Sequence, residues 1–575
     1  MIKLLIVMFL CGISVALNDD QSDPVVCYSM GCVRGKNYVG NIKPYEGFFG
    51  IPYVKQPVGD LRLKDPQPIT EKFTEIYNAT EEKMFCAQKN YLLPNPSVIG
   101  VEDCLYLYVY RPKNWQRKNK KPLPILIYIH GGAFFAGIAG PSVTGGDYIM
   151  DTEDVIFVTM SYRLGPLGFL STGDENISGN FGLKDQAMAI KWVKDNIYAF
   201  GGDPNNIALM GQSAGAASVH LHMMSPWSCR NFHKAIILSG NGIAPYAYVL
   251  KDPFQQARKY AIASGMKLTS EMTKQDLANY LRNVDTKTLL DATDSFKIWS
   301  IDPLVISRPV VEDCSKVHGF LCEDPVKMWR NGIHSHIPLI TGYMDGDGGV
   351  RSLQYFENQE LLEELNNNLD GLMPKLLEIV DPLSENVTTN RWKQVKDRYF
   401  NGQNKLEPNQ WKNLMKLYTD RSFVTPMADT LLQLVKSESK SPAYLYKFNF
   451  RGPLSNSILY TGTTKDFGTV HSDELIYLLK SPLLFPQQYD ANSREGIFRS
   501  RFVKFFTYFA INGKPPKANN KTLHRCIKNE AFAVGTRQLK CSYIDFDEKI
   551  SIKAEGAIDN DAVDFWNQID TTLVK

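Results

Sequence analysis

The chain has almost no net charge and no low-complexity tract. Its 64 Lys and Arg residues nearly balance 61 Asp and Glu residues, which leaves a formal charge of +3 over 575 residues. Nucleic acids and anionic membranes attract proteins through a basic surplus, so this balance gives no electrostatic case for either partner. The hydrophobic fraction is 44%, and neither an internal repeat nor a Pro/Gly/Ser linker divides the chain. These features indicate a globular chain with a large core, and we expect its partners to be small neutral molecules.

The sequence also lacks a recognisable membrane anchor. The apolar stretch near the start, residues 4–13, follows Lys3 and stops before Asn18, well short of the roughly 20 apolar residues that a membrane span needs. A basic start, a short apolar stretch and small residues at 14–16 are typical of a secretory signal. The last residues carry neither a hydrophobic tail for a lipid anchor nor an ER-retention signal. We therefore expect residues 1–16 to be a signal peptide, residues 17–575 to be the mature domain, and the protein to be secreted and extracellular.

Cysteine is sparse, and no zinc-binding pattern is present. Of ten cysteines, Cys11 lies in the expected signal peptide, which leaves nine in an oxidising compartment where close pairs tend to form disulfides. A bridge between Cys86 and Cys104 would stiffen a loop that contains Pro94 and Pro96. The sequence alone does not prove the connectivity of the rest. The other close pairs are Cys27 with Cys32, Cys314 with Cys322, and Cys526 with Cys541, which leaves Cys229 unpaired.

Four Asn-x-Ser/Thr sequons are present, the acceptor pattern for N-glycosylation. Any single sequon arises easily by chance, but four of them fit a secreted glycoprotein. The acceptor residues are Asn78, Asn176, Asn386 and Asn520.

Apolar strand-like runs alternate with helix-like stretches between residues 123 and 238. The strand-like runs cover 123–129, 155–162, 207–210 and 235–239, and a helical stretch covers 185–198. This alternation predicts an α/β fold with a mostly parallel sheet flanked by helices. Runs at 338–343 and 443–448 are expected to extend the same sheet, and a helix at 493–511 to close the fold. Leucine spacing between 360 and 440 predicts packing helices, not a separate binding module.

The pentapeptide Gly211-Gln212-Ser213-Ala214-Gly215 follows one of these strand-like runs and precedes helix-compatible residues. A strand, a sharp turn and a helix would lift Ser213 into a cleft, and the flanking glycines permit the strained turn. The pattern alone arises often by chance. It predicts a nucleophile only if the chain also supplies a base, an acid and donors for an oxyanion.

A serine hydroxyl becomes a nucleophile when a histidine takes its proton, and a carboxylate must orient that histidine. In hydrolases with this type of sheet the chain order is serine, acid, histidine. Asp347 comes directly after the run at 338–343, and His471 lies further on in a loop with a glycine and an acidic flank. Asp345 is the reserve acid, to be preferred if Asp347 points away.

Donors for an oxyanion are expected from a glycine-rich loop after the run at 123–129. The sequence there is His130-Gly131-Gly132-Ala133-Phe134. The backbone N–H groups of Gly132 and Ala133, together with that of Ala214 after the serine, would form a three-pronged oxyanion hole. Loss of one such donor costs roughly 3–4 kcal/mol of transition-state stabilisation.

These motifs together resemble the carboxylesterase/cholinesterase family of α/β-hydrolases over nearly all of the mature length. The resemblance implies an α/β-hydrolase fold in a single large catalytic domain and hydrolysis of carboxylic esters without a cofactor or metal. It also implies Ser213 as nucleophile, His471 as general base and Asp347 as orienting acid, with Gly132, Ala133 and Ala214 as oxyanion donors and Cys86–Cys104 as a disulfide. Further matching segments are Gly50-Ile51-Pro52-Tyr53, Leu61-Arg62, Glu102-Asp103-Cys104-Leu105, Ser161-Tyr162-Arg163, Asn180-Phe181-Gly182-Leu183-Lys184-Asp185-Gln186 and Phe200-Gly201-Gly202-Asp203-Pro204.

Two departures from the family pattern touch the site. Asp347 stands where the family usually has a glutamate, and because its side chain is shorter by one methylene, its loop must approach His471 more closely. Aspartate serves this role in many related hydrolases, so we expect activity. Ala133 replaces the common third glycine and keeps its N–H group, while its methyl group narrows the floor of the site.

The resemblance also bears on the substrate. Cholinesterases place a tryptophan inside the first disulfide loop to stack on a quaternary ammonium, whereas the loop closed by Cys86 and Cys104 contains only Tyr91 as an aromatic residue. Gln212 stands where many relatives have a glutamate and removes a negative charge that would favour a cation. We therefore expect neutral, largely apolar esters, with Phe134 and Phe135 as walls of the pocket.

Two alternatives remain open at the level of sequence. The G-Q-S-A-G pentapeptide and the Gly468-x-x-His471-x-x-Glu474 spacing resemble insect juvenile hormone esterases, although general insect carboxylesterases share most of these features. The same fold also hosts non-catalytic adhesion proteins in which a member of the triad is lost. Here all three members are present, but an adhesion or ligand-sequestering protein stays the alternative from another class. The oligomeric state is left open.

Overall fold

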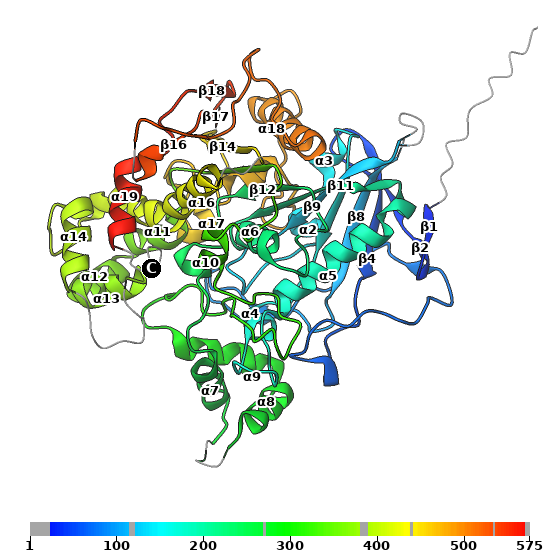
Figure 1. Ribbon diagram of the computed structural model, residues 1–575, viewed down its shortest axis with the longest axis horizontal. Coiled ribbons are helices and arrows are strands. Elements are labelled where there is room, and N and C mark those ends of the chain that lie inside the picture. Colours follow the sequence, from blue (N-terminus) through cyan, green and yellow to red (C-terminus); the bar gives the residue numbers. More distant parts are fainter. Residues whose placement is uncertain are drawn as a thin grey trace, which may run out of the picture.

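The computed structural model describes residues 23–113, 115, 121–267, 269, 272–379, 389–437, 441–532 and 535–569. Within them, a large sheet of eleven strands runs through the centre of the molecule (Figure 1) in the order β18-β17-β14-β13-β12-β11-β9-β10-β8-β4-β3. The strands are β3 (Lys36–Val39), β4 (Pro44–Pro52), β8 (Tyr106–Pro112), β9 (Leu123–Ile129), β10 (Ile156–Met160), β11 (Gly202–Gln212), β12 (Lys234–Leu238), β13 (Leu339–Tyr343), β14 (Ala443–Phe448), β17 (Tyr543–Phe546) and β18 (Ser551–Lys553).

The middle of the sheet is parallel and its two margins are antiparallel. Neighbouring strands from β10 to β17 all pair in parallel. The pairings of β8, β4 and β3 at one margin and of β18 at the other are antiparallel. The predicted mostly parallel α/β sheet is confirmed, and the antiparallel margins are what the sequence pattern did not reveal.

Alternate residues of the central strands pack into two separate cores, one on each face of the sheet. In β9, for example, Ile127 belongs to one core and Tyr128 to the other, and in β11 Leu209 and Met210 divide in the same way. Successive side chains of a strand point to opposite faces, and a parallel sheet is buried on both. This is why these strands read as unbroken apolar runs in the sequence.

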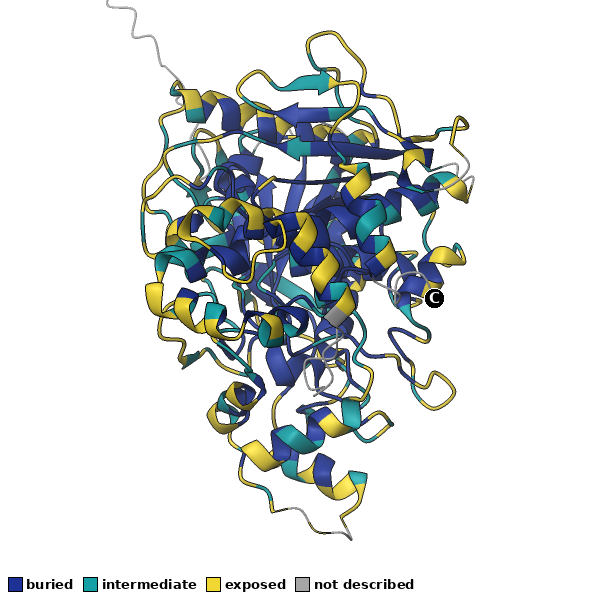
Figure 2. Cartoon of the chain, turned by 90° about the vertical axis from the view of Figure 1, so that its left-hand side faces the viewer, coloured by how far each residue is buried: buried dark blue, intermediate teal, exposed yellow. Residues whose placement is uncertain are grey.

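Helices supply the cover on both faces. The first face packs against α5 (Phe181–Asn196) and α6 (Ala214–Met224), whose buried residues share a core with that face. The second face packs against α18 (Arg494–Asn512), which contributes the rings of Phe502, Phe505 and Phe506. Figure 2 shows the result, with buried strands inside and exposed residues on the outer turns and loops.

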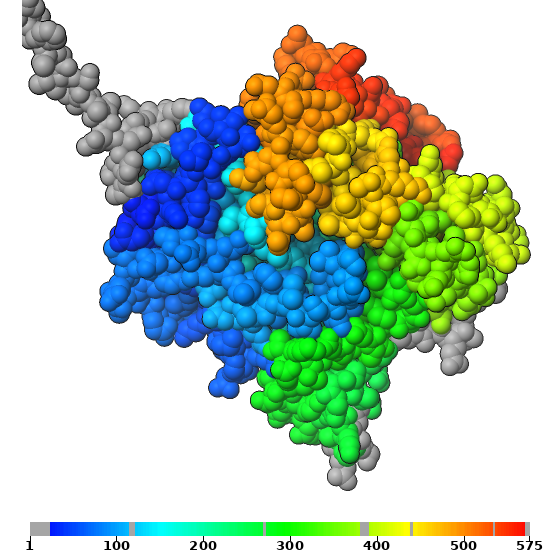
Figure 3. All heavy atoms as spheres, turned by 180° about the vertical axis from the view of Figure 1, so that it is seen from behind, coloured from blue at the N-terminus to red at the C-terminus, as the bar shows by residue number. Residues whose placement is uncertain are grey.

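Two groups of helices lie outside these layers. The first contains α7 (Pro253–Ala263), α8 (Lys274–Asn283) and α9 (Thr286–Asp291), which project at one end of the molecule (green in Figures 1 and 3) around a core of their own. The second contains α12 (Gln359–Asn367), α13 (Leu369–Leu376), α14 (Thr389–Phe400) and α15 (Trp411–Thr419), which bury Leu362, Leu365, Leu414 and Leu417 in a further cluster. The leucine spacing thus marks packing helices, as expected.

The predicted Cys86–Cys104 disulfide is present, and the close pairs whose connectivity the sequence left open are also bonded. Cys86–Cys104, Cys27–Cys32, Cys314–Cys322 and Cys526–Cys541 are bonded, and Cys229 is free. Among the described residues no helix is long and apolar enough to cross a membrane. The expected signal peptide, residues 1–16, and the sequon at Asn386 lie outside the described residues.

Candidate active site

Ser213 occupies the sharp turn between β11 and α6. Its φ of 57° and ψ of −124° are unfavourable for a residue with a Cβ atom, and strain of this kind costs on the order of 1–3 kcal/mol. Both flanking glycines are needed for the turn. A Cβ at Gly211 would lie 2.3 Å from the carbonyl oxygen of Gly215, and a Cβ at Gly215 would lie 2.1 Å from that of Ile129. The turn therefore has the geometry of a nucleophile elbow.

Asp347 and His471 form a buried acid–base pair. Oδ1 of Asp347 lies 2.7 Å from Nδ1 of His471, and Oδ2 accepts a hydrogen bond of 2.9 Å from the backbone N–H of Met344. The Asp347 side chain is completely buried, and that of His471 is 5% exposed. Asp345, the reserve acid, points elsewhere: its carboxylate is 63% exposed and pairs with Lys447 at 2.8 Å. The geometry thus joins Asp347, and not Asp345, to the histidine.

The loops that carry these two residues approach each other closely. A parallel bridge joins Gly346 to Val470. A Cβ at Gly346 would lie only 2.2 Å from the carbonyl oxygen of Thr469, so glycine is required there. This close approach brings the Asp347 side chain within hydrogen-bond distance of His471. The side chain of aspartate is shorter than that of glutamate by one methylene, so a close approach of the two loops is needed.

Residues 130–137, called the glycine loop below, lie beside the serine. A Cβ at Gly131 would lie 2.9 Å from Cβ of Ser213. Gly132 has a φ of 106° and Ala133 a φ of 53°, and the loop curls so that the N–H groups of Phe135 and Ala136 both donate to the carbonyl oxygen of Gly132. Within the described residues, the N–H groups of Gly132 and Ala133 have no acceptor in the protein. They remain available to an oxygen bound near the serine.

His130 fixes the base of the glycine loop. Its ring stacks on that of Tyr162 with the centroids 4.4 Å apart, and the Tyr162 hydroxyl donates to the carbonyl oxygen of His130. Burial lowers the pKa of His130 to about 4, so the ring is neutral at physiological pH. A Cβ at Gly137 would lie 2.0 Å from Nδ1 of His130, which explains the glycine there.

The predicted pocket residues occupy three different surroundings. The Phe134 ring is buried and packs against Phe169 at a centroid distance of 5.1 Å. Phe135 packs edge-on against Tyr91 and lines a small apolar cavity next to the glycine loop. Gln212 is 2% exposed, and its amide nitrogen lies 3.3 Å from Nε2 of His471. Gln212 therefore contacts the acid–base pair itself.

Two contacts of His471 had no signal in the sequence. The Phe423 ring lies 5.0 Å from the imidazole, and the Tyr460 hydroxyl donates to the backbone carbonyl of His471. Phe423 belongs to η6 (Asp420–Val424), a single π-helical turn between α15 and α16 (Thr425–Lys436). Turns of this kind are frequent at functional sites, but no residue pattern predicts them.

Glu474 is the least expected residue near the pair. Its side chain is fully buried, and neither carboxylate oxygen has a hydrogen-bond partner among the described residues. Burial, and next the negative charge of Asp347, raise the pKa of Glu474 well above its ordinary value. Both effects favour the neutral form of this carboxyl group.

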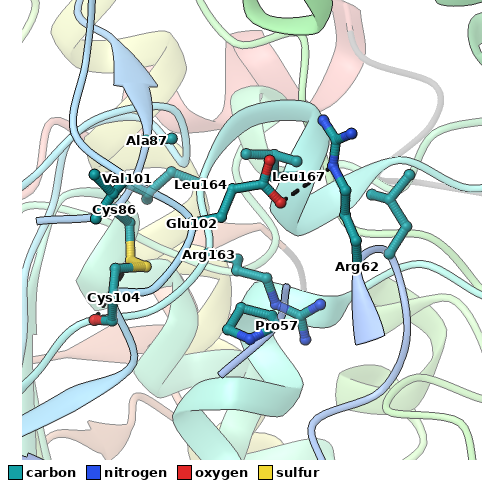
Figure 4. Close-up of a pocket in the computed structure, with 11 residues that line it drawn as sticks. Pro57, Arg62, Cys86, Ala87, Val101, Glu102, Cys104, Arg163, Leu164 and Leu167 are labelled. Carbon is teal, nitrogen blue, oxygen red and sulfur yellow. Dashed lines mark hydrogen bonds and ion pairs between the residues drawn. A yellow bond between two sulfur atoms is a disulfide. The ribbon is translucent and has the colours of Figure 1, made fainter. Parts of the chain in front are cut away.

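Several residues of the family-like segments form ion pairs that hold the surrounding loops. Arg163 and Asp185 form a bidentate pair with distances of 2.7 and 2.8 Å. Arg62 contacts Glu102 at 3.1 Å, beside the Cys86–Cys104 disulfide and a small cavity of about 10 Å³ (Figure 4). These pairs are structural and lie apart from the serine. Within the described residues, no group of His, Cys, Asp or Glu side chains is arranged to hold a metal ion.

The described sequons differ in exposure. Asn78 and Asn520 are exposed, whereas Asn176 is partly buried and its side chain donates to Asp174 at 3.1 Å. A glycan at Asn176 would attach to the nitrogen that donates this hydrogen bond. Asn78 and Asn520 are the more accessible acceptors.

Comparison with known proteins identifies the family of the chain. The model of the Carboxylesterase family matches residues 22–566. The juvenile hormone esterase of Tribolium castaneum is 36% identical over 559 residues, which cover 95% of this chain and 93% of the relative. Venom carboxylesterase-6 of Apis mellifera is 32% identical over 90% of each chain. The crystal structure of juvenile hormone esterase from Manduca sexta, with OTFP covalently attached, matches with a TM-score of 0.79 and 26% identity over 95% of this chain and 99% of that one. The chain therefore belongs to the carboxylesterase family and is a carboxylic ester hydrolase.

Proposed function

We propose that the protein is a secreted serine esterase that hydrolyses neutral, largely apolar esters through an acyl-enzyme. The observation that carries this proposal is the strained Ser213 turn beside the buried Asp347–His471 pair, whose nitrogen and oxygen atoms lie 2.7 Å apart. The family membership supplies the reaction, and these three side chains supply a route for it.

In this route, Oγ of Ser213 attacks the ester carbonyl carbon while Nε2 of His471 takes the hydroxyl proton. Asp347 holds Nδ1 and stabilises the imidazolium that forms. The oxyanion accepts hydrogen bonds from the N–H groups of Gly132, Ala133 and Ala214. The imidazolium then protonates the departing alcohol, and a water molecule, deprotonated by the same histidine, hydrolyses the acyl-enzyme.

The choice of neutral esters rests on the residues around the pair. The side chain next to the serine is the uncharged Gln212, and Phe423 adds an apolar ring beside His471. A cationic ester would find no compensating carboxylate at position 212. Desolvation of an unpaired charge is costly, so neutral acyl and alcohol groups suit these surroundings better.

The test is hydrolysis of a naphthyl or nitrophenyl ester by the purified protein. Removing the nucleophile of such a triad costs on the order of 10⁶ in kcat, so Ser213→Ala is expected to abolish turnover. Ser218→Ala is the matched control, because Ser218 lies on the same helix and its hydroxyl only donates to the carbonyl oxygen of Ala214. An inactive wild-type protein, or a Ser213→Ala variant that keeps its turnover, would sink the proposal.

A more specific form of this proposal is that the substrate is juvenile hormone. The similarity to the juvenile hormone esterases of Tribolium castaneum and Manduca sexta supports it, but general esterases such as venom carboxylesterase-6 are also similar. The measurement is kcat/KM for juvenile hormone against a simple nitrophenyl ester. A value for the hormone at least about tenfold above that of the simple ester would favour hormone turnover, and a lower value would favour general esters.

Secretion is part of the same proposal. The expected signal peptide and the sequons at Asn78, Asn176, Asn386 and Asn520 support it, as do four disulfides, which persist in oxidising compartments. Expression in insect cells should release protein into the medium with its N-terminus at residue 17, and deglycosylation should lower its mass. Retention of the full-length chain inside the cells would count against secretion.

A further inference from the structure

The contact between Gln212 and His471 joins two residues with different expected roles. The amide nitrogen of Gln212 lies 3.3 Å from Nε2 of His471, and both side chains are buried. The other end of the Gln212 amide lies close to Gly131, since a Cβ added there would lie 2.9 Å from its Oε1 atom. Gln212 is therefore held in place against the nitrogen that must accept the proton of Ser213.

The chemistry of the pair fixes which group donates. Nδ1 of His471 contacts the Asp347 carboxylate, which only accepts hydrogen bonds, so the imidazole proton resides on Nδ1. Nε2 of the neutral ring then presents a lone pair. Only the NH₂ group of the Gln212 amide can donate a hydrogen bond to that lone pair. This contact stabilises the neutral imidazole.

We propose that Gln212 is a positioning residue for the base, because its amide holds Nε2 of His471 as an acceptor until the serine hydroxyl replaces it. The inference rests on the proposed function, since it assigns a task to a side chain within the proposed triad. It goes beyond substrate preference, because it gives the amide at position 212 a task in orienting the base. A glutamate at the same place would instead attract a proton to Nε2.

Other titratable groups near the pair must be distinguished from this effect. Asp473 is buried and accepts hydrogen bonds from Val470, Asn456 and Ser455, and burial raises its pKa to about 7. Burial, and next the negative charge of Asp347, raise the pKa of Glu474 as well. Titratable and charged groups on neighbouring elements are Asp347 after β13, Asp473 and Glu474 on η7 (Asp473–Tyr477), Asp420 and Arg421 on η6, Tyr460 on α17 (Ser457–Thr461), Tyr446 on β14 and Tyr246 on η3 (Pro245–Ala247).

The experiment compares the pH dependence of kcat/KM for a neutral nitrophenyl ester in wild type, Gln212→Glu and Gln212→Met. Gln212→Glu is expected to move the acid limb upward by at least about one pH unit, so kcat/KM at pH 5.5, relative to its plateau, falls about tenfold. Gln212→Met removes the donor without adding a charge and is expected to move the limb upward by less. An acid limb that stays at the wild-type position in both variants would overturn the inference, because a packing role alone moves stability and not the limb.

A matched pair elsewhere in the chain provides the control. Gln186 is also fully buried, and its Oε1 atom lies 2.9 Å from Nε2 of His222, a residue of α6. Gln186→Glu and Gln186→Met make the same exchanges beside a histidine outside the triad. They are expected to leave the acid limb in place even if thermal stability falls. An equal movement of the limb in Gln186→Glu would also contradict the inference.

The two proposals fail separately. Absence of hydrolysis in wild type, or hydrolysis that survives Ser213→Ala, defeats the proposed function. Hydrolysis that depends on Ser213 but shows an unmoved acid limb in the Gln212 variants defeats only the role of Gln212. Active-site concentrations from the nitrophenol burst of each variant keep partial misfolding from being read as a change of rate.

Discussion

At the scale of single residues, Asp345 and Asp347 are two positions apart but have opposite surroundings. Asp347 is buried against His471, whereas Asp345 is exposed and paired with Lys447. The tight turn between them causes this, since the N–H of Asp347 donates to the carbonyl oxygen of Met344 and the side chain turns inward. A role cannot pass from one aspartate to the other without rebuilding the turn.

This difference gives a prediction with its own internal control. Asp347→Asn is expected to lower kcat about 10⁴-fold, because an amide beside Nδ1 favours the wrong tautomer of the histidine. Asp345→Asn removes only an exposed ion pair, which is worth at most about 1 kcal/mol, and is expected to keep activity within about twofold. Steady-state kinetics on a nitrophenyl ester measure both, and equal losses in the two variants would contradict the assignment of the acid.

The buried carboxyl group of Glu474 makes the stability of the fold depend on pH. A carboxyl group buried without a hydrogen-bond partner favours its neutral form, so its pKa in the folded state exceeds that in the unfolded chain. The folded state then binds more protons than the unfolded state at pH values between the two. By linkage, the stabilising effect of this proton is complete below the unfolded pKa of about 4.3 and is lost as pH rises.

Glu474→Gln tests this linkage because it keeps the shape and removes the titration. The loss of Tm between pH 5 and pH 8 is expected to be smaller in the variant than in wild type by at least about 1 °C, the size that a difference of one in pKa gives in a chain of this length. Calorimetry at both pH values measures the effect. Equal losses of Tm in the two proteins would mean that Glu474 is ionised when folded.

At the scale of elements, Gly132 and Ala133 of the glycine loop illustrate two different backbone requirements. A Cβ at Gly132 would lie 2.0 Å from the carbonyl oxygen of Ala136, so the loop closes only around a glycine. Ala133 has a φ of 53°, which costs roughly 1–2 kcal/mol relative to an unstrained backbone. The methyl group of Ala133 is therefore kept at some expense of stability.

Substitutions at these two positions should act in opposite directions. Gly132→Ala is expected to displace the donors and to lower kcat/KM about 10²–10³-fold, the size of a lost oxyanion contact. Ala133→Gly relieves the strain and is expected to add up to about 1 kcal/mol of stability while activity is retained. Urea unfolding and ester hydrolysis measure the two effects, and a stabilised Gly132→Ala variant would speak against this description of the loop.

Among the helices, η6 shows how an irregular element places a functional side chain. The π-helical turn interrupts the otherwise regular course from α15 to α16 and directs Phe423 at His471. A regular helix would turn the same residue by a different angle about the axis. No residue pattern in this stretch indicates the additional residue that a π-helical turn contains. Sequence periodicity therefore could not predict the contact between Phe423 and His471.

At the scale of the whole molecule, local patterns predicted the strands that carry the site. The runs at 123–129 and 443–448 coincide with β9 and β14 because both are short apolar segments bounded by polar turns. The turn at Ser213 and its flanking glycines could also be predicted, because the steric requirement for glycine is contained in the pentapeptide 211–215. The carboxylesterase membership over residues 22–566 and the relatives named as esterases leave the adhesion alternative without support.

Contacts between distant segments were beyond the sequence. Gln212 and His471 are 259 positions apart, and nothing at either position indicates that their side chains meet. The antiparallel margins of the sheet and the isolation of the Glu474 carboxyl group are likewise consequences of packing. Sequence thus predicted which residues take part and left open how their side chains face one another.

The position of β11 in the sheet has a further consequence. Within the described chain, β12, β13, β14, β17 and β18 lie on one side of it and β9, β10, β8, β4 and β3 on the other. Local opening of a sheet begins at its margins, where hydrogen bonds are fewest and solvent is nearest. The strand that ends at the serine is thus the last to be reached by such fraying, and its amide hydrogens should be among the slowest in the molecule to exchange with solvent. Partial unfolding of either margin can then coexist with an intact turn at Ser213.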